Sequence, residues 1–404
     1  MLLNIDNIPY VGRDGEVSYR TDHAIAQKIS EYVEDQDVFY IEIFTGEDLT
    51  LVDLTEIVPA DILNRIQSGD VKIAFHNIHE AFHTICLGII KTVIKYDIDT
   101  SDVIIMTSNH DMVTWASRVA SRLNVDMPRI ILVEVFEIQA SCILEDFLNR
   151  VDGLDNWIKC TYNTDKITHR YLNLNRRQRA HRVMLVTALL AKKLHTSGKI
   201  SFGNSDFEES SNQEEIISSS PFYWMDIPDI VKIIDQKNKF IMDSIPMYLD
   251  TDDLVTNRAV SKLAEVELYN TTGISVVSET TFFSSACPHG NYTPEPGVFL
   301  SEKAWKPVLH HHPWVMVSQP YTQQAMKNYG YQTFSELWDE SYDYEENDVQ
   351  RMYMLLKLIE KFHNWSTDKF MDIIKQSENI CRHNLELLRS KQHGSDFISE
   401  LVPV

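Results

Sequence analysis

The stretch 103–133, VIIMTSNHDMVTWASRVASRLNVDMPRIILV, decides the fold of the first part of the chain. Two almost continuous apolar runs, Val103–Met106 and Ile130–Val133, enclose Met112–Leu123, in which apolar residues recur at helical spacing. Short runs that are apolar throughout are typical of strands buried on both faces. The order strand, helix, strand predicts a parallel sheet with a right-handed crossover.

The same alternation extends toward the N-terminus. Strands are expected at Val38–Phe44 and Val71–Phe75, and helices at Asp61–Ser68 and Ile78–Lys95. Residues 1–165 are therefore predicted to form a doubly wound, Rossmann-like α/β domain. Ligands of such a domain lie beyond the carboxyl ends of its strands.

The alternation resumes after residue 165. The expected strands are Tyr171–Leu174, Ile274–Val277 and Trp314–Val317, and the expected helices are Gln178–His195, one starting near Ser301, and Gln323–Asn328. This pattern predicts a second doubly wound domain over 166–345, with a mobile acidic loop at 203–220. Helical patterns at 348–362 and 370–389 predict C-terminal helices within 346–404. Two such domains in one chain place the expected active site in the cleft between them.

Composition excludes several classes of protein. The chain has 404 residues, with 37 Lys and Arg against 59 Asp and Glu, which gives a net charge of −22. Such a charge repels nucleic acid and anionic membranes unless a local basic surface overrides it. No run of about 18 apolar residues occurs, so no membrane span is expected. The first residues lack a signal-like apolar core, and the five cysteines form no CxxC pair, which favours a reducing cytoplasm.

The segment Lys166–Lys199 holds nine Lys or Arg residues and no Asp or Glu. Its centre, which contains Asn175, Arg176, Arg179 and Arg182, lies where a strand ends and a helix begins. Backbone N–H groups favour an anion at that point, and arginine adds bidentate donors, so the segment suits a diphosphate. The alternative is a solvated basic helix face that pairs with acidic residues elsewhere.

A second polar cluster follows two other predicted strand ends. Ser301 would cap a helix whose first residues are Glu302 and Lys303, and Glu279 ends the preceding strand. A carboxylate there can accept hydrogen bonds from ribose hydroxyls, and an ammonium group can contact phosphate. Each residue taken singly is more often an exposed charge.

The segment His79-Glu80-Ala-Phe-His83 matches the H-E-x-x-H pattern. On a helix the two histidines share a face and can bind zinc, with the Glu as base. No third ligand stands at either usual spacing. We therefore expect no metal, and we take Glu80 as a candidate acid or base for an acceptor group.

Ser108-Asn-His-Asp111 follows another predicted strand. His110 or Asp111 could deprotonate an acceptor hydroxyl, although a Ser, Asn and Asp junction can equally cap the next helix. His310–His312 is expected to be a turn before Pro313 because three consecutive histidines cannot all face one point. Neither GxxxxGK[ST] nor GxGxxG occurs, which disfavours P-loop and simple dinucleotide sites.

Several segments together carry a resemblance to a known group. Leu174–Arg182, Val277–Thr280, Phe299–Pro307, His312–Val315 and Gly330–Asp343 occur in this order and resemble phage and large-virus proteins regarded as glycosyltransferases. Ser301-Glu-Lys-Ala-Trp305 is also similar to the Thr-Glu-Lys motif of fucosyltransferase-like enzymes of the GT-B fold, with Ser in place of Thr. In those enzymes the Glu and Lys contact the nucleotide sugar.

The resemblance implies a two-domain glycosyltransferase. By this resemblance Glu302 and Lys303 would contact a UDP- or GDP-sugar donor. The arginines are assigned to its diphosphate on electrostatic grounds. The resemblance does not extend to the acceptor side in the first domain, where Glu80 or Asp111 would deprotonate the acceptor by virtue of its own chemistry. Some phage glycosyltransferases modify hydroxymethylated DNA bases, for which Lys166–Lys199 is the one evident basic surface. The competing readings are a zinc hydrolase at His79, Glu80 and His83, and a binding module without catalytic activity.

Overall fold

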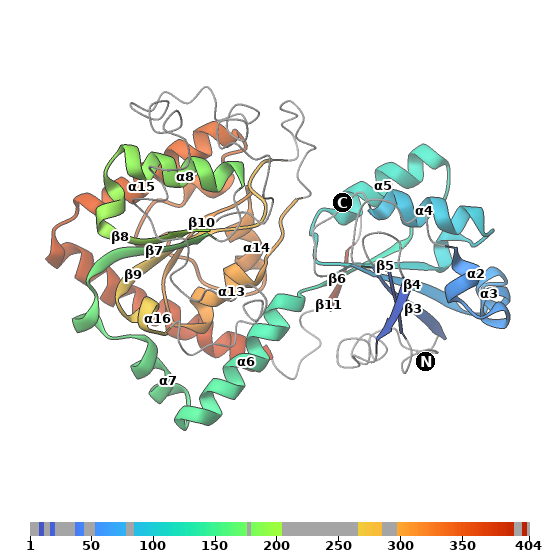
Figure 1. Ribbon diagram of the computed structural model, residues 1–404, viewed down its shortest axis with the longest axis horizontal. Coiled ribbons are helices and arrows are strands. Elements are labelled where there is room, and N and C mark those ends of the chain that lie inside the picture. The colour runs from blue at the N-terminus through green and yellow to red at the C-terminus, as the bar shows by residue number, and fades with distance from the viewer. Residues whose placement is uncertain are drawn as a thin grey trace. The chain divides into compact units, whose positions relative to one another are not determined.

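The computed structural model describes residues 8–11, 17–20, 37–43, 53–77, 85–175, 179–203, 266–284, 297–391 and 398–401. The chain forms two compact units. Unit 1 comprises Met1–Ile138, Pro296–Phe299 and His393–Val404, and unit 2 comprises Gln139–Glu295 and Leu300–Gln392. Each unit is an α/β structure built on its own sheet, as the sequence predicted (Figure 1).

Unit 1 contains a seven-stranded sheet with the order β11-β6-β5-β4-β3-β1-β2. Its strands are β1 (Ile8–Val11), β2 (Val17–Arg20), β3 (Val38–Ile43), β4 (Lys72–Asn77), β5 (Val103–Thr107), β6 (Arg129–Val133) and β11 (Ile398–Leu401). The five central strands, β6, β5, β4, β3 and β1, pair in parallel. The two edge strands, β2 and β11, are antiparallel to their neighbours. The two antiparallel edges are additions that the sequence pattern did not reveal.

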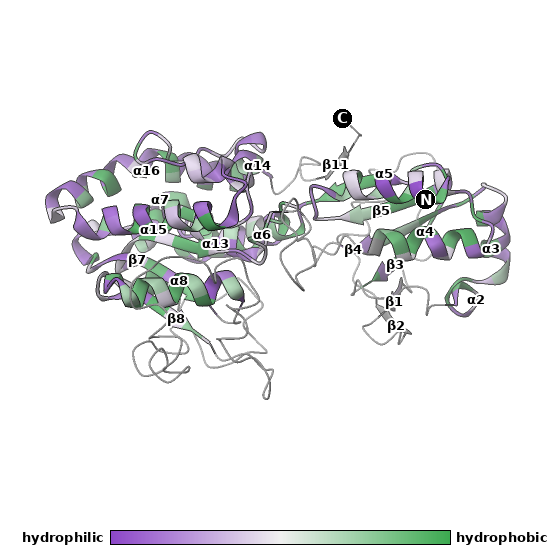
Figure 2. Cartoon of the chain, turned by 90° about the horizontal axis from the view of Figure 1, so that it is seen from above, coloured by the Kyte–Doolittle hydropathy of each residue, from purple (hydrophilic) through white to green (hydrophobic). Residues whose placement is uncertain are grey.

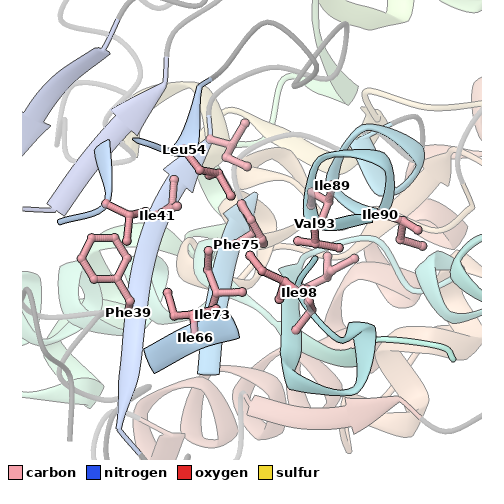
Figure 3. Packing of buried hydrophobic residues seen from close by; sticks show 14 of the residues in the cluster. Phe39, Ile41, Leu54, Ile66, Ile73, Phe75, Ile89, Ile90, Val93 and Ile98 are labelled. Carbon is pink, nitrogen blue, oxygen red and sulfur yellow. The ribbon is translucent and has the colours of Figure 1, made fainter. Parts of the chain in front are cut away.

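The described helices of unit 1 share one hydrophobic core with the sheet. They are α2 (Leu54–Ile57), α3 (Ala60–Gln67), α4 (Ile85–Lys95) and α5 (Met112–Leu123). Alternate strand residues such as Phe39, Ile41 and Phe75 pack against Ile66 and Val93 of the helices (Figure 3). Side chains on the opposite face, among them those at positions 40, 74 and 104, are buried as well. Burial on both faces explains the continuous apolar runs.

Unit 2 contains a four-stranded parallel sheet with the order β10-β9-β7-β8. Its strands are β7 (His169–Asn175), β8 (Gly198–Phe202), β9 (Thr272–Ser278) and β10 (Trp314–Val317). From β7 the chain crosses outward to β8, and from β9 it crosses to β10 on the other side. The adjacent strands β7 and β9 therefore form a topological switch point, as expected for a doubly wound sheet.

The helices of unit 2 cover both faces of this sheet. They are α6 (Val135–Val151, which begins in unit 1), α7 (Leu154–Thr161), α8 (Ala180–Ala191), α12 (Val266–Asn270), α13 (Glu302–Leu309), α14 (Thr322–Asn328), α15 (Asp348–Asn364) and α16 (Thr367–Ser390). In Figure 1, α8 and α15 lie on one face, and α13 and α16 lie on the other. Positions 180 to 190 of α8 are all buried, and the helix is largely green in Figure 2. A helix that is apolar on all sides is typical of a protein interior.

The domain limits differ from the predicted 165 and 345. The division falls within α6, because the second half of α6 and α7 pack with unit 2: the Phe147 and Trp157 rings stack at 4.7 Å, and Trp157 Nε1 donates to the Leu309 carbonyl oxygen at 2.8 Å. Helices α15 and α16 also belong to unit 2. The predicted acidic loop at 203–220 lies, except for Gly203, outside the described residues.

Two further sequence expectations can be compared with the described part of the chain. No helix there is long and apolar enough to cross a membrane. Cys86, Cys142, Cys160 and Cys381 are free thiols, and Cys287 lies outside the described residues.

The three consecutive histidines form the predicted turn between α13 and β10. His310, His311 and His312 are all buried. The His310 ring stacks on Tyr269 at 4.0 Å, and His312 interacts with the Ser275 hydroxyl through Nδ1 and the Thr272 carbonyl oxygen through Nε2, both at 2.8 Å. Burial lowers the pKa of His310 to about 3, and that of His311 and His312 to about 4.

These histidines are expected to make unit 2 acid-labile. Unfolded histidine has a pKa near 6.5, so between about pH 6.5 and pH 4 the unfolded state binds more protons and each histidine removes about 1.4 kcal/mol of stability per pH unit. Asp343, whose pKa burial raises to about 6, offsets part of this loss. Urea unfolding followed between pH 7.5 and 4.5 should show a falling midpoint. His311→Asn should flatten the slope more than His383→Gln, a control at a partly exposed position where glutamine can still donate to the Gly330 carbonyl oxygen. Identical slopes for wild type and His311→Asn would contradict the assignment.

Candidate functional site at the switch point of unit 2

The carboxyl ends of β7 and β9 bring together residues that are far apart in the sequence. Asn175 ends β7, and Glu279 and Thr280 follow β9. The helices α8 and α13 begin beside these strand ends. The switch point of an open α/β sheet is where ligands bind, and helix N-termini there present unpaired N–H groups.

Glu279 is the buried centre of this site. Its carboxylate accepts hydrogen bonds from the backbone N–H groups of Thr280 (2.7 Å), Ser301 (3.1 Å) and Ala304 (3.1 Å), and from the Ser301 hydroxyl (2.6 Å). Burial raises its pKa, against the lowering influence of Lys303 and of the Ser301 hydrogen bond. Glu279 lies at the predicted strand end, and in this structure its oxygens bond the start of α13 to the end of β9.

Glu302 and Lys303 project from this fixed helix start and are partly exposed. The Lys303 ammonium lies 2.7 Å from Glu302 Oε1, 3.1 Å from the Ser301 hydroxyl and 3.3 Å from Thr280 Oγ1. The side chains of Lys303 and Glu302 are 27% and 30% exposed. Burial acts to raise the pKa of Glu302, but the Lys303 charge and hydrogen bond hold it at about 2, so the Glu302 carboxyl group is ionised near neutral pH.

Ser301 caps α13 as the sequence predicted. Its hydroxyl oxygen accepts a hydrogen bond from the Lys303 backbone N–H at 3.3 Å while the hydroxyl donates to Glu279. Threonine at this position could make the same two bonds.

The start of α8 is bonded to the end of β9. The Arg182 guanidinium donates to the carbonyl oxygens of Ser278 (3.2 Å) and Glu279 (2.8 Å), and His181 Nε2 lies 3.0 Å from the same Glu279 oxygen. Burial, with the nearby Arg182 and Arg179 charges, lowers the pKa of His181 well below its usual value, so the ring is neutral. Arg182 is buried, and Arg179 is the partly exposed N-cap residue. The two residues therefore differ in their access to a ligand.

Asn175 belongs to a buried polar network beneath the site. Its amide nitrogen donates to Asn173 Oδ1 at 2.6 Å, and the Asn173 amide donates to Ser278 Oγ at 3.1 Å. The network joins the ends of β7 and β9 through side chains. It fixes the spacing of the two strand ends on which Lys303 and Arg179 depend.

Other basic residues of the segment Lys166–Lys199 make contacts within unit 2. Arg170 donates to the Trp365 carbonyl oxygen, Lys192 pairs with Glu360 at 3.2 Å, and Lys199 donates to Thr271 Oγ1. The Lys192–Glu360 pair agrees with the alternative of basic residues paired with acidic ones, whereas Arg170 and Lys199 bond a carbonyl oxygen and a hydroxyl.

Several predicted residues fall outside the described part of the chain. His79, Glu80, His83 and Arg176 are among them, so the zinc motif and the preferred acceptor-side acid or base stay predictions. Among the residues that the structure describes, no group of three or more His, Cys, Asp or Glu side chains could hold a metal ion.

In unit 1, Asp111 follows the carboxyl end of β5. It is the N-cap residue of α5 but makes no side-chain capping bond; the Asn109 side chain instead accepts from the Asp111 N–H at 2.9 Å. Burial raises the pKa of Asp111, against the lowering effect of His110 and Arg118. His110 Nε2 lies 2.6 Å from Oε1 of the buried Glu134, which directly follows β6. Sequence reasoning missed Glu134, although its place directly after a buried strand could have marked it.

A hollow of about 480 Å³ lies elsewhere in unit 1. It is lined by Ile98–Thr100 and Asn124–Asp126, which precede β5 and β6. These are the amino ends of parallel strands, opposite to the edge where ligands of α/β sheets bind. We do not count it as the functional site.

Comparison with known proteins gives only distant structural similarity. No protein-family model and no curated protein matches the chain. It is similar to HepE of Anabaena, solved in complex with UDP and glucose, at 12% identity and a TM-score of 0.38, with coverage of 90% of this chain and 92% of that one. An Escherichia coli structure described as trehalose-6-phosphate bound with UDP-2-fluoro glucose is similar at 10% identity and a TM-score of 0.38, with coverage of 93% of this chain and 77% of that one. A glycosyltransferase from Rickettsia africae is similar at 10% identity and a TM-score of 0.35, with coverage of 90% of each chain. These values are too low to carry a functional argument.

Proposed function

We propose that the protein is a glycosyltransferase that moves a sugar from a UDP- or GDP-sugar to an acceptor hydroxyl. The observation that carries the proposal is the geometry around Glu279. A buried carboxylate fixes the start of α13 at the switch point, so that Lys303 and Glu302 are held, in contact with each other and partly exposed, at the edge of the sheet where ligands of α/β folds bind. The resemblance of Ser301–Trp305 to a donor-binding motif of GT-B enzymes supports the same reading.

The proposed roles in donor binding follow from charge and, among the described residues, from exposure. Lys303 and Arg179 neutralise the diphosphate, and Glu302 accepts hydrogen bonds from ribose or sugar hydroxyls. Arg176, which lies outside the described residues, is proposed for the diphosphate from its charge and its place in the sequence alone. Glu279, Arg182 and Asn175 were predicted as direct ligands. Because they are buried, we propose that they position the exposed residues instead.

The reaction breaks the bond between the anomeric carbon and the phosphate oxygen, and the nucleoside diphosphate leaves with the electron pair. The acceptor oxygen forms the new bond to that carbon and loses its proton. Lys303 and the arginines stabilise the charge that develops on the leaving group. Glu80 or Asp111 of unit 1 takes the acceptor proton, and burial raises the pKa of Asp111 toward the range useful for a base.

A hydroxymethylated DNA base is the finer acceptor that the resemblance suggests. It requires a local basic surface on a chain of charge −22. Since Arg170, Arg182 and Lys199 are engaged in contacts within unit 2, nothing described supports such a surface, and the proposal names only an acceptor hydroxyl.

Calorimetry with UDP- and GDP-sugars tests the donor site. We expect one of these donors to bind with a dissociation constant in the micromolar to millimolar range that is usual for enzyme substrates. Absence of heat with every common UDP- and GDP-sugar would refute the proposal.

Nucleotide release from the donor that binds then separates an enzyme from a binding module. Asp111→Asn and Glu80→Gln should keep donor affinity within about twofold because neither residue is assigned a donor contact, and at least one should lose transfer by about 100-fold or more. Donor binding without nucleotide release by the wild type, across a panel of acceptor alcohols and saccharides, would favour the module without catalytic activity.

A further inference from the structure

Two exposed tyrosines form a surface that the proposed reaction does not use. Among the described residues only four large hydrophobic side chains are exposed: Leu87, Ile94, Tyr321 at 43% and Tyr344 at 50%. The Tyr321 and Tyr344 rings contact each other, with centroids 6.0 Å apart and planes at 72°. We call this pair the tyrosine corner.

The rings of the tyrosine corner are held in place while much of their area stays exposed. Tyr321 is the N-cap of α14 with φ 65°, a left-handed conformation that a bulky residue rarely adopts. Its N–H donates to the Asp343 carbonyl oxygen at 2.6 Å, and its hydroxyl donates to Glu346 Oε1 at 2.8 Å. The Tyr344 hydroxyl donates to Gln324 Oε1 at 3.1 Å. The tyrosine side chains therefore lose little conformational entropy when a ligand stacks on them.

The tyrosine corner follows the carboxyl end of β10, the edge of the sheet where ligands bind. β10 pairs with β9 up to Val317 and Ser278, and the Gln319 amide donates to the Phe283 carbonyl oxygen at 2.8 Å. Arg351 also bonds both segments, through the carbonyl oxygens of Ser318 and Phe282. The segment that carries Tyr321 is thus fixed beside the segment that follows Glu279.

The charge around the tyrosine corner favours some ligands over others among those that can stack on aromatic rings. Residues 336–348 contain seven Asp or Glu and no Lys or Arg. Those at 336, 339 and 346 are exposed, whereas the buried Glu340 and Asp348 lie near Lys327 (3.9 Å) and Arg351 (2.6 Å), so the exposed surface is acidic on balance. Such a field repels a nucleotide or a nucleic acid strand, which would otherwise stack on tyrosine. A neutral ligand with an apolar ring face meets no such repulsion.

The polar groups beside the rings suit hydroxyl groups. Gln324 and the exposed Asn328 supply amides, and Glu346 supplies a carboxylate, so donors and acceptors occur together. A sugar hydroxyl uses one of each, whereas a cation uses acceptors alone. The polarised C–H face of a pyranose ring also fits the negative face of an aromatic ring.

We propose that the tyrosine corner is a binding site for a neutral glycan, separate from the nucleotide-sugar site at Lys303. The glycan chain stacks sugar rings on Tyr321 and Tyr344 and bonds through its hydroxyls to Gln324, Asn328 and Glu346. The site does not depend on the proposed transfer. It could hold a glycan to which the enzyme adds sugars, or a glycan that the protein only binds.

Affinity electrophoresis of the full chain tests this site. Native gels would contain neutral polymers of glucose, of mannose, of galactose or of N-acetylglucosamine, one in each gel. We expect at least one polymer to retard the wild type. Tyr344→Ala, and Tyr321→Asn, which keeps a residue tolerant of the left-handed backbone, should each raise the dissociation constant about tenfold. Tyr321→Phe, which keeps the ring, and Leu87→Ala, which removes an exposed apolar side chain of unit 1, should leave the mobility shift unchanged.

Circular dichroism and donor calorimetry of the same variants complete the test. Unchanged spectra and unchanged donor heats in Tyr344→Ala show that the lost glycan affinity is local. The inference is overturned if no neutral polymer retards the wild type, or if the tyrosine variants shift as the wild type does. A glycan-binding protein without any donor heat would refute the proposed function and keep this site, and donor binding without glycan binding would do the reverse.

Discussion

Replacing Lys303 with alanine is expected to lower the turnover number for sugar transfer by about 100- to 1,000-fold, the usual cost of removing one well-placed charge-stabilising donor. The ammonium lies within 3.3 Å of Ser301 Oγ, Thr280 Oγ1 and Glu302, so it is held in place before a ligand arrives. Its contribution should grow as the diphosphate leaves. Steady-state nucleotide release from the donor found by calorimetry measures the effect, and the loss should be larger in the turnover number than in donor affinity.

Lys192→Ala is the matched control for this prediction. Lys192 follows α8 and forms a surface ion pair with Glu360, so its removal should change activity by less than twofold. A Lys303→Ala variant that keeps wild-type turnover would remove the leaving-group role and, with it, the main support for a transferase.

Replacing Glu279 with alanine is expected to destabilise unit 2 by about 3–5 kcal/mol, because several donors lose a charged acceptor and each hydrogen bond to a charged group contributes about 1.5–3 kcal/mol. Four donors lose their acceptor: the N–H groups of Thr280, Ser301 and Ala304, and the Ser301 hydroxyl. Ser301 and Ala304 are buried, so water does not easily replace the acceptor there, whereas Thr280 is partly exposed. Urea unfolding followed by tryptophan fluorescence reports mainly on this unit, because Trp157, Trp305, Trp314, Trp338 and Trp365 lie in it.

Glu302→Ala provides the comparison, since it removes a neighbouring carboxylate that is partly exposed. Its ion pair with Lys303 should contribute at most about 1 kcal/mol. Equal unfolding midpoints for Glu279→Ala and Glu302→Ala would show that Glu279 is not the group that holds α13.

Much of the fold could be predicted because the local patterns were strong. Met112–Leu123 and Trp314–Val317 have the predicted limits, and the other predicted strands and helices that fall among the described residues occur within a few residues of their expected ends. The strands β1, β2, β8 and β11 were not predicted, because each has only four or five residues and depends on its neighbour in the sheet. The helices α6 and α7 were not predicted either.

The candidate site was predicted in part. Ser301 as a cap followed from the residue type before a helical pattern, and the placement of Glu279 beside it followed from two strand ends of one sheet. The burial of Arg182 could not be predicted from the sequence, because an arginine within a basic segment is expected to be exposed. Only the fold reveals that its guanidinium meets the carbonyl oxygens of Ser278 and Glu279.

Apolar periodicity and the order of elements were enough to predict two α/β units with parallel central strands, since both are local properties of the chain. The sequence also determined which residue types stand at the strand ends. The tertiary structure decided which of those charges are free to meet a ligand. Burial and hydrogen bonding depend on segments far apart in the chain, as when residues 279 and 301 share one carboxylate, or when two tyrosines 23 positions apart in the sequence form a single corner.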